Sequence, residues 1–163
     1  MIVLGVDPGS QRCGYAVLDG ATRKPKILEA GVIRPKSKAL AGKLFEIVGD
    51  VGALVTEHRV EVIAMETAFV GEFPRAVIVL AHVRGALIGL IPALRESTQR
   101  TVDIVEPTPQ QVKYLVTGKQ NSSKALMQQA IQWHFGLSKP PEPPDVADAL
   151  GIALWGLTIG ATV

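Results

Sequence analysis

Two acidic residues stand directly after short apolar runs in this chain of 163 residues. Asp7 follows the apolar run over residues 2–6, and Glu66 follows a second run over residues 60–65. Such runs are typical of buried strands, and an ionisable group at the end of a core strand lies at the sheet edge, where sites are commonly built. Asp7 has a simpler alternative role, because Asp-Pro-Gly forms a good turn by itself.

A second pair of acids, Asp145 and Asp148, falls at the start of an apolar stretch with helical character. Their spacing of three places both carboxylates on one face of the predicted helix. An alternative role for Asp145 is to stabilise the helix dipole from the first turn. Asp148 lies deeper in the helix, among small apolar residues, so capping explains it less well.

Taken together, the four acids predict a site for a hard divalent cation. Close carboxylates repel one another unless a cation lies between them. Ligands that are all oxygen favour Mg²⁺ or Mn²⁺ over zinc. Two such cations, roughly 3.5–4 Å apart, can activate water and stabilise the departing oxygen in phosphodiester hydrolysis. The expected catalytic groups, which are also the expected ligands of two Mg²⁺ or Mn²⁺ ions, are Asp7, Glu66, Asp145 and Asp148.

Other common catalytic or metal-binding motifs are missing from the sequence. The three histidines and the single cysteine show no zinc spacing. A Walker loop is excluded because Gly118-Lys119 is followed by Gln120 rather than by Ser or Thr. The serine-hydrolase elbow is also lacking, so the acids remain the strongest chemical signal.

The acids must be positioned by a mixed set of strands and helices. Three strands joined by short turns suggest an antiparallel meander, since parallel pairing needs a long crossover. The later elements alternate, which predicts an α/β fold with helices packed on a mixed sheet. At this length we expect one domain over residues 1–163. The predicted strands cover residues 2–6, 15–18, 27–33, 60–65 and 102–105, and the predicted helices cover 40–55, 74–94, 109–116, 123–135 and 145–157.

The charge distribution fits a protein that binds phosphates. The formal net charge is only +2, which does not call for a polyanionic partner. However, residues 30–45 and 107–141 contain no acid and carry several lysines, among them Lys113 and Lys124. These side chains can neutralise phosphate or position a nucleic-acid backbone. The alternative is that both stretches are simply solvated faces.

The remaining composition predicts a cytoplasmic protein. One cysteine, Cys13, excludes an internal disulfide and fits a reducing compartment. The N-terminus lacks the pattern of a secretory signal. The apolar stretch over residues 76–94 approaches the length of a membrane span, yet it contains His82, Arg84 and Pro92. A buried helix of a soluble protein is the better interpretation, and no membrane partner is expected.

The chain resembles the RuvC family of bacterial Holliday junction resolvases. The resemblance spans residue 2 to about residue 155, with motifs in the family's order and spacing. One such motif is a weak signal, whereas five ordered motifs are a strong one. The motifs are Asp7-Pro8-Gly9-Ser10 with Gly14-Tyr15, Glu66-x-x-Phe69, Arg84-Gly85, Val112-Lys113 with Lys124 eleven residues on, and Asp145-x-x-Asp148-Ala149-Leu150.

The resemblance implies a ribonuclease-H-like fold, a five-stranded mixed sheet with helices on both faces. It implies a homodimer that nicks two strands of a four-way DNA junction symmetrically, with Mg²⁺ or Mn²⁺, in recombination and repair. A two-fold dimer suits that task because two identical sites meet two equivalent strands. The helix from residue 74 is the candidate interface, since it is apolar nearly all round; burial within the monomer is the alternative. The family is also associated with the RuvA–RuvB branch-migration complex.

The resemblance also assigns roles to residues outside the acids. Lys113 and Lys124 match positions that contribute to DNA binding or catalysis, and Arg75 and Lys119 are further expected DNA contacts. Phe69 matches an aromatic that stacks on an unpaired base, an interaction worth about 1–3 kcal/mol for any base. Its alternative role is core packing.

The sequence departs from the family's pattern at several positions. Phe73 stands where a polar residue is usual, and Ala81-His82 replaces a usual glycine. The usual Gly-x-Gly turn before the second lysine is here Gly118-Lys119-Gln120. These changes leave the acids intact and bear on sequence preference.

Three other functions could account for part of the same residue pattern. A related nuclease of the same fold, acting on RNA–DNA hybrids or ribosomal RNA precursors, would share the acids without requiring Phe69 or the dimer helix. An actin-like ATPase would need two lobes and a second Asp-x-Gly loop. An inactive DNA-binding module would gain nothing from four acids, which weaken binding to a phosphate chain. We therefore expect a resolvase first and a related nuclease second.

Overall fold

The computed structural model describes residues 1–67 and 74–160, without the side chains of residues 74–76 and 160. Within these ranges it contains the strands β1 (Ile2–Asp7), β2 (Cys13–Asp19), β3 (Lys26–Ile33), β4 (Val62–Met65) and β5 (Asp103–Val105). The helices are α1 (Leu40–Glu57), α2 (Pro74–Thr98), α3 (Pro109–Thr117), α4 (Lys124–Phe135) and α5 (Pro144–Gly160).

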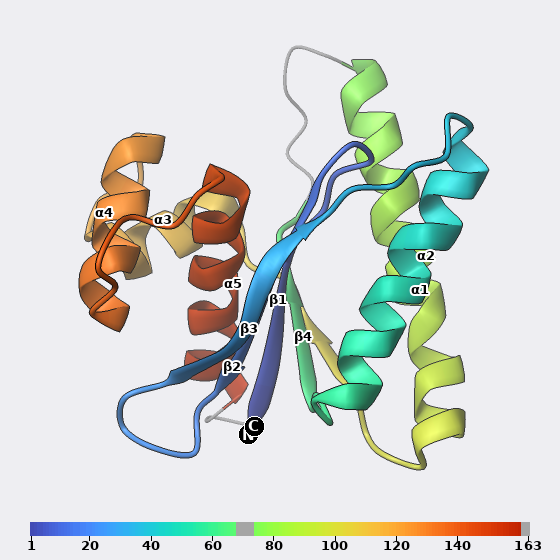
Figure 1. The fold of residues 1–163 in the computed structure, drawn as a ribbon, viewed down its shortest axis with the longest axis horizontal. Coiled ribbons are helices and arrows are strands. Elements are labelled where there is room, and N and C mark those ends of the chain that lie inside the picture. Colours follow the sequence, from blue (N-terminus) through green and yellow to red (C-terminus); the bar gives the residue numbers. More distant parts are fainter. Residues whose placement is uncertain (68–73, 161–163) are drawn as a thin grey trace.

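The strands form one mixed sheet in the order β3-β2-β1-β4-β5. The predicted meander is confirmed, because β1 pairs antiparallel with β2 and β2 pairs antiparallel with β3. The long connection through α1 allows β4 to run parallel to β1, and β5 runs parallel to β4. As a result, β1, β4 and β5 all end at the same edge, the upper one in Figure 1.

Helices cover both faces of this sheet, as Figure 1 shows. On one face, α1 and α2 pack over a core that includes Leu4, Val6 and Ile63. On the other face, α5 packs directly on the sheet and α3 and α4 pack against α5. All four residues of β4 are buried because the strand lies inside the sheet with helices on both sides.

The helices that carry Lys113 and Lys124 have well-defined N-terminal ends. At the start of α3, Thr108 accepts a hydrogen bond from the backbone N–H of Gln111, and the Gln111 side chain accepts one from the backbone N–H of Thr108. Ser123 caps the start of α4 in the same way, by accepting from the backbone N–H of Leu126. Such caps are worth about 0.5–2 kcal/mol each. They fix the helical turns on which Lys113 and Lys124 lie.

Most predicted boundaries differ from the structure by a few residues: β2, for example, begins at Cys13 rather than at residue 15. Two of the differences have a clear physical reason. β4 begins at Val62 rather than at residue 60, because Val60 instead donates a hydrogen bond to the carbonyl oxygen of Val55 and closes the turn after α1. The α2 helix continues to Thr98 rather than ending at residue 94. Pro92 is tolerated inside it on the exposed side, and the hydroxyl of Thr98 binds the carbonyl oxygen of Leu94 in the last turn.

The α2 helix buries a single stripe. Its buried side chains, spaced by three or four residues, are Val83, Leu87, Ile91 and Leu94. The segment Val77–Thr98 is long and apolar enough to cross a membrane, with a mean hydropathy of 2.0, but these properties alone are weak evidence. Only 22% of the most apolar window is buried, so most of its apolar surface faces away from the core.

Candidate active site

Asp7 and Glu66 lie next to each other at the upper edge of the sheet. Val6 of β1 pairs with Met65 of β4, so the two acids that follow leave adjacent parallel strands at the same level. Two contacts fix the backbone around Glu66. The backbone N–H of Thr67 donates to the carbonyl oxygen of Pro107 at 2.8 Å, and the guanidinium of Arg84 donates to the carbonyl oxygen of Glu66.

Two glycines allow α5 to reach the same edge. A Cβ atom on Gly5 of β1 would lie 2.3 Å from the carbonyl oxygen of Ala149, and one on Gly14 of β2 would lie 2.4 Å from that of Asp145. Gly14 is also the direct pairing partner of Asp7. The missing side chains therefore let the backbone of α5 contact the strands. This close packing brings the first turns of α5, with Asp145 and Asp148, to the end of β1.

The electrostatics show that the carboxylates share one site. Burial raises the pKa of Asp7 to about 8, with further contributions from Asp148, Glu66 and Asp145. Burial and the charge of Asp148 raise the pKa of Glu66 to about 7. The pKa of Asp148 is also raised, first by burial and then by Asp145. Mutual repulsion of this kind requires short separations, so the structure brings the four predicted acids together.

Two lysines border this cluster on the α3 and α4 side. The charge of Lys124 acts to lower the pKa of Asp7 and of Asp148. The charge of Lys113 acts in the same direction on Glu66 and Asp148. A group of half-buried acids with cations beside it can hold a divalent cation and still attract a phosphodiester.

Comparisons with known proteins agree on one family. A family model described as "Crossover junction endodeoxyribonuclease RuvC" matches residues 3–155. The chain is 35% identical over 162 residues to the crossover junction endodeoxyribonuclease RuvC of Prosthecochloris aestuarii, an alignment that covers 99% of this chain and 83% of that protein. The chain belongs to the RuvC family.

Solved structures extend the likeness to the whole RuvC fold. The Thermus thermophilus RuvC structure matches with a TM-score of 0.82 and 23% identity, over 99% of this chain and 96% of that one. The same protein in complex with a Holliday junction substrate matches with a TM-score of 0.81 and the same coverage. The expected ribonuclease-H-like fold, a five-stranded mixed sheet with helices on both faces, is confirmed.

The remaining predicted contacts of this RuvC-family protein have different positions. Lys119 is exposed in the connection between α3 and α4, where its backbone N–H donates to the hydroxyl of Thr117 at 3.2 Å. Its charge is not among the causes that shift the pKa values of Asp7, Glu66 and Asp148. Phe69 lies outside the described residues, and so does the side chain of Arg75. Their predicted roles therefore stay predictions.

Two arginines at the site were not assigned a role from the sequence. Arg84 of α2 is nearly buried and joins the carbonyl oxygen of Glu66 to the carboxylate of Glu106, so it ties the ends of β4 and β5 to the helix. Its membership of a family motif was the signal that could have revealed it. Arg12, between β1 and β2, lies 3.7 Å from the carboxylate of Asp145. Sequence pattern offered no signal for that contact.

A tighter group of possible metal ligands lies elsewhere. The ligand atoms of Glu29, Glu57 and His58 all lie within 4.8 Å of one another, a spacing that no three of the four RuvC-site acids reach. However, Glu29 already accepts hydrogen bonds from Tyr15 and His58, both at 2.8 Å. These partners lower its pKa. The group is explained by its own hydrogen bonds and lies away from the strand ends that carry Asp7 and Glu66.

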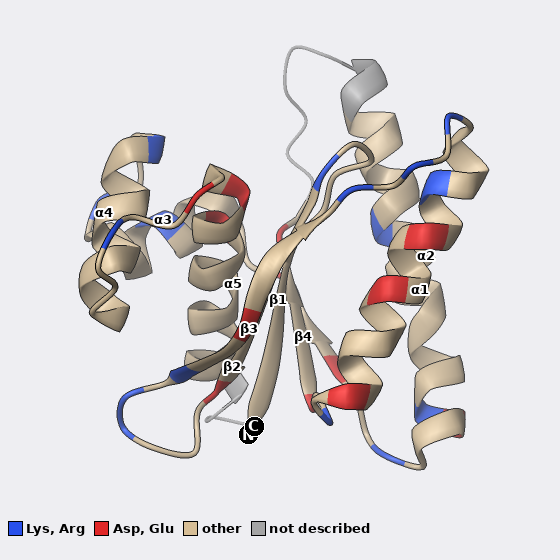
Figure 2. Ribbon diagram, in the orientation of Figure 1, with Lys and Arg blue, Asp and Glu red and all other residues tan. Residues whose placement is uncertain are grey.

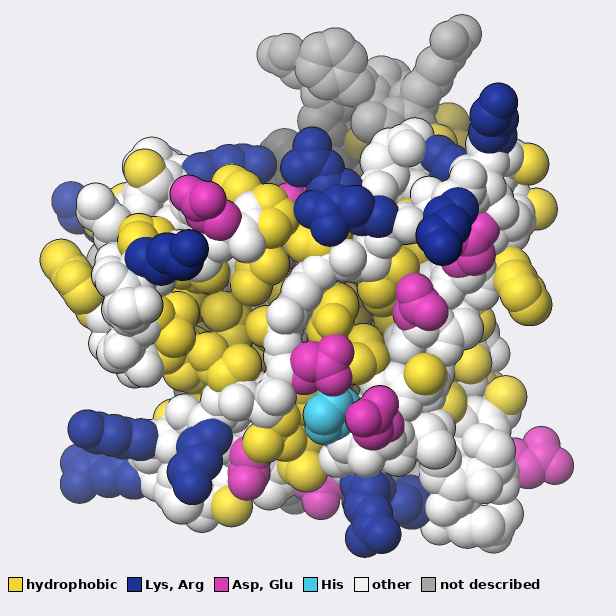
Figure 3. Space-filling view, viewed as in Figure 1, with side chains coloured by type: hydrophobic (Ala, Val, Ile, Leu, Met, Phe, Trp, Pro, Cys, Tyr) yellow, Lys and Arg dark blue, Asp and Glu magenta, His cyan; other side chains and the backbone are white. Residues whose placement is uncertain are grey.

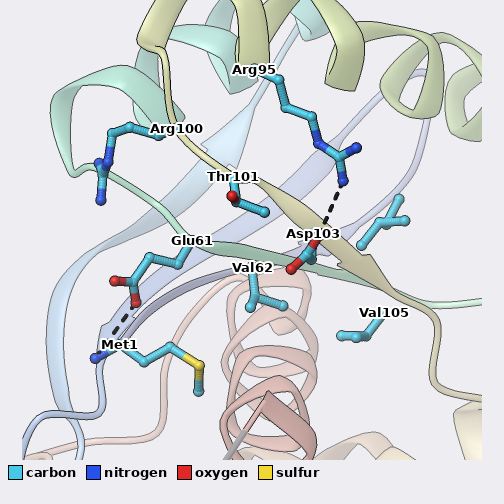
Figure 4. A pocket seen from close by; sticks show the side chains of 9 residues that line it. Met1, Glu61, Val62, Arg95, Arg100, Thr101, Asp103 and Val105 are labelled. Atoms are coloured by element: carbon cyan, nitrogen blue, oxygen red, sulfur yellow. Dashed lines mark hydrogen bonds and ion pairs between the residues drawn. The ribbon is translucent and has the colours of Figure 1, made fainter. Parts of the chain in front are cut away.

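A hollow of about 910 Å³ also lies apart from the four acids. It is at the opposite ends of β4 and β5, where it is lined by residues such as Glu61, Arg95 and Asp103 (Figure 4). Its charges are mostly paired: Arg95 binds Asp103 at 3.0 Å, and the N-terminal amine lies 3.6 Å from Glu61. Size therefore does not identify the active site of this chain; the convergence of carboxylates does.

Proposed function

We propose that this RuvC-family protein is a structure-selective DNA endonuclease that resolves Holliday junctions in the cytoplasm, as a single domain over residues 1–163. The observation that carries the proposal is the convergence of Asp7, Glu66, Asp145 and Asp148 at one sheet edge. The named relatives are crossover junction endodeoxyribonucleases, and the Thermus thermophilus protein has been solved with a Holliday junction. These names supply the substrate class, and the acids supply the chemistry.

The four acids fit a divalent metal. Their oxygen atoms suit a hard cation, and the raised pKa values of Asp7 and Glu66 mean that their negative charges lack full compensation within the chain. We propose that they hold two Mg²⁺ or Mn²⁺ ions per site, which would activate water and stabilise the charge of the departing oxygen.

The lysines would align the DNA strand. Lys113 and Lys124 reach the acids from α3 and α4, so they can contact the phosphate to be cut and its neighbours. Figure 3 shows Lys and Arg side chains along the upper part of the molecule, the end at which β1 and β4 finish. Lys119, Arg75 and Phe69 complete the proposed DNA contacts, with Phe69 stacking on an unpaired base.

A symmetric cut of two strands requires a dimer. The exposed face of α2 includes Ile78, 56% exposed, and Ile88, 42% exposed, on a helix whose buried stripe is already used by the core. Large exposed apolar side chains on one helix favour a protein interface. We propose that α2 pairs with its copy in a homodimer, and that the RuvA–RuvB complex delivers the junction.

The test is cleavage of a labelled four-way junction beside a linear duplex and an RNA–DNA hybrid, each with Mg²⁺ or Mn²⁺. We expect paired symmetric nicks in the junction and no cutting of the other two substrates. Cutting of the hybrid with an intact junction would instead establish the related nuclease that acts on RNA.

The Asp7→Asn variant is the matching prediction for the acids. It should lose cleavage, because a charged metal ligand is gone, while its affinity for the junction stays within about 3-fold, because the lysines remain. The control is Glu96→Gln, the same loss of charge at an exposed acid near the far end of α2. Full cleavage by Asp7→Asn would remove Asp7 from the site.

A further inference from the structure

A second hollow, of about 440 Å³, is lined by one of the four acids, Asp145. It lies among the connection from β1 to β2, the start of α4 and the start of α5. The side chains that line it include Ser10, Arg12, Lys124 and Asp145. In Figure 2 these three segments lie on the same upper side of the molecule. The hollow is thus an extension of the proposed active site.

The Arg12 guanidinium has unused hydrogen-bond donors that can bind an anion in this hollow. Its side chain is 57% exposed, and its contact with Asp145 is a single ion pair at 3.7 Å. Over the described ranges, no hydrogen bond of its guanidinium is found. Because the group has five N–H donors in a planar fork, it can keep Asp145 on one side and bind phosphate oxygens on the other.

The segment that carries Arg12 is held firmly at both ends. A Cβ atom on Gly9 would lie 2.2 Å from the carbonyl oxygen of Arg12, so the turn closes tightly on itself. On the other side, Gly14 packs on the backbone of Asp145. The backbone at Arg12 is therefore held close to the backbones of Asp7 and Asp145 by a short connection between two strands.

Lys124 provides the second cation of the hollow. It is exposed at the first turn of α4, and the part of the chain that is described contains no ion pair for it. The Ser10 hydroxyl adds a hydrogen-bond donor. Two cations and a hydroxyl facing open solvent, beside acids that carry out the cut, match the chemistry of a phosphodiester.

We propose that this hollow binds the DNA backbone phosphate next to the one that is cut, with Arg12 and Lys124 as its binding residues. The inference rests on the proposed nuclease function, because it requires a strand that runs across the four acids. Arg12 then aligns the strand by binding one phosphate while its ion pair keeps Asp145 at the rim of the same hollow.

The first experiment measures junction binding in EDTA, which prevents cutting. Arg12→Ala should bind about 10-fold more weakly than wild type. Its plot of log affinity against log salt should be less steep by about 0.9, the value for one lost phosphate contact. Arg23→Ala is the matched control, an exposed arginine in the β2–β3 connection at the other end of the molecule. It should bind as wild type does.

The second experiment removes the phosphate charge instead. Single methylphosphonates are placed at the phosphates on either side of the cut. At one of these positions the neutral linkage should weaken binding by wild type about 10-fold, and it should weaken binding by Arg12→Ala clearly less, because only the contact with Lys124 is then left to lose. Losses that multiply at both positions, or Arg12→Ala with wild-type affinity, would overturn the proposal.

The outcomes separate this inference from the proposed function. If wild type neither binds nor cuts the junction, the function itself fails. If Arg12 only orients Asp145, Arg12→Ala should slow single-turnover cleavage but leave the affinity, the salt slope and the sensitivity to methylphosphonates unchanged. That result would reject the proposal that the hollow binds a phosphate. Arg12→Lys, which keeps the charge but loses the planar fork, should recover part of the affinity only if a phosphate is bound.

Discussion

The carboxyl groups of Asp7 and Glu66 have pKa values of about 8 and about 7, well above their ordinary values of 3.8 and 4.5. Burial is the first cause in both cases, and repulsion between the acids adds to it. Between pH 5 and 8 these two groups therefore bind more protons in the folded, metal-free protein than in the unfolded chain. The free energy of unfolding must then fall as pH rises through this range.

This linkage gives a prediction at the residue scale. In EDTA, the melting temperature of wild type should fall between pH 5 and pH 8, whereas Asp7→Asn, which has no charge to bury, should fall less. At pH 8 the variant should melt at least about 4 °C above wild type. Mg²⁺ should stabilise wild type more at pH 8 than at pH 5, because the cation replaces bound protons. Thermal unfolding followed by fluorescence measures the pH dependence of both proteins and the effect of Mg²⁺.

The control for this prediction is again Glu96→Gln, which removes an exposed acid away from the cluster. It should keep the wild-type dependence of melting temperature on pH. A wild-type protein whose stability without metal does not change between pH 5 and pH 8 would contradict the raised pKa values.

At the scale of the elements, two arginines of α2 bind the sheet at opposite ends of its strands. Arg84 joins the carbonyl oxygen of Glu66 to Glu106, near the carboxyl ends of β4 and β5. Arg95 binds the carbonyl oxygen of Val102 and the carboxylate of Asp103, at the start of β5. Both tie the helix to the sheet, but only Arg84 does so beside the acids.

We therefore predict different consequences for the same substitution. Arg84→Ala should slow single-turnover cleavage about 10-fold or more with little change in affinity for the junction, because Glu66 loses the contact that fixes its backbone. Arg95→Ala should destabilise the fold by about 1 kcal/mol and leave cleavage unchanged. Equal cleavage rates in the two variants would show that Arg84 does not position Glu66.

A pair of glycines tests how α5 reaches the site. Gly5→Ala would place a methyl group against the backbone of α5, so it should cost about 1–3 kcal/mol of stability and reduce cleavage by moving Asp145 and Asp148 away from Asp7. Gly49→Ala meets nothing within 4 Å on α1 and should stabilise by about 0.5–1 kcal/mol. Urea unfolding and cleavage assays measure both; a harmless Gly5→Ala would contradict the direct contact.

On the scale of the whole molecule, the exposed face of α2 predicts the assembly. Ile88→Asp should convert the proposed dimer into a monomer, since a charge cannot be buried in an apolar interface. The monomer should lose paired nicks on the two strands of the junction. Light scattering gives the mass, and Leu28→Asp on β3 is the control, because Leu28 is 44% exposed against 42% for Ile88. A dimer that persists in Ile88→Asp would move the interface away from this face.

The sequence by itself determined the chemistry and most of the elements. An apolar run predicts a buried strand, so the acids that follow two such runs, Asp7 and Glu66, could be identified without a structure. The spacing of three between Asp145 and Asp148 likewise fixes a shared helical face. The ordered motifs indicated the RuvC family, which the comparisons bear out.

The tertiary structure alone decided how these parts meet. The contacts of Gly5 and Gly14 with α5 join residues more than a hundred positions apart, and no local periodicity encodes such a distance. The ion pair of Arg12 with Asp145 joins residues that are similarly far apart in the sequence, and the contact of Arg84 with Glu66, 18 positions apart, also follows no local period. Periodic patterns report which face of an element is buried, whereas a site depends on how closely two backbones approach. The distance between two backbones is set by the volume of the side chains that pack between them, and these side chains meet only after the chain has folded.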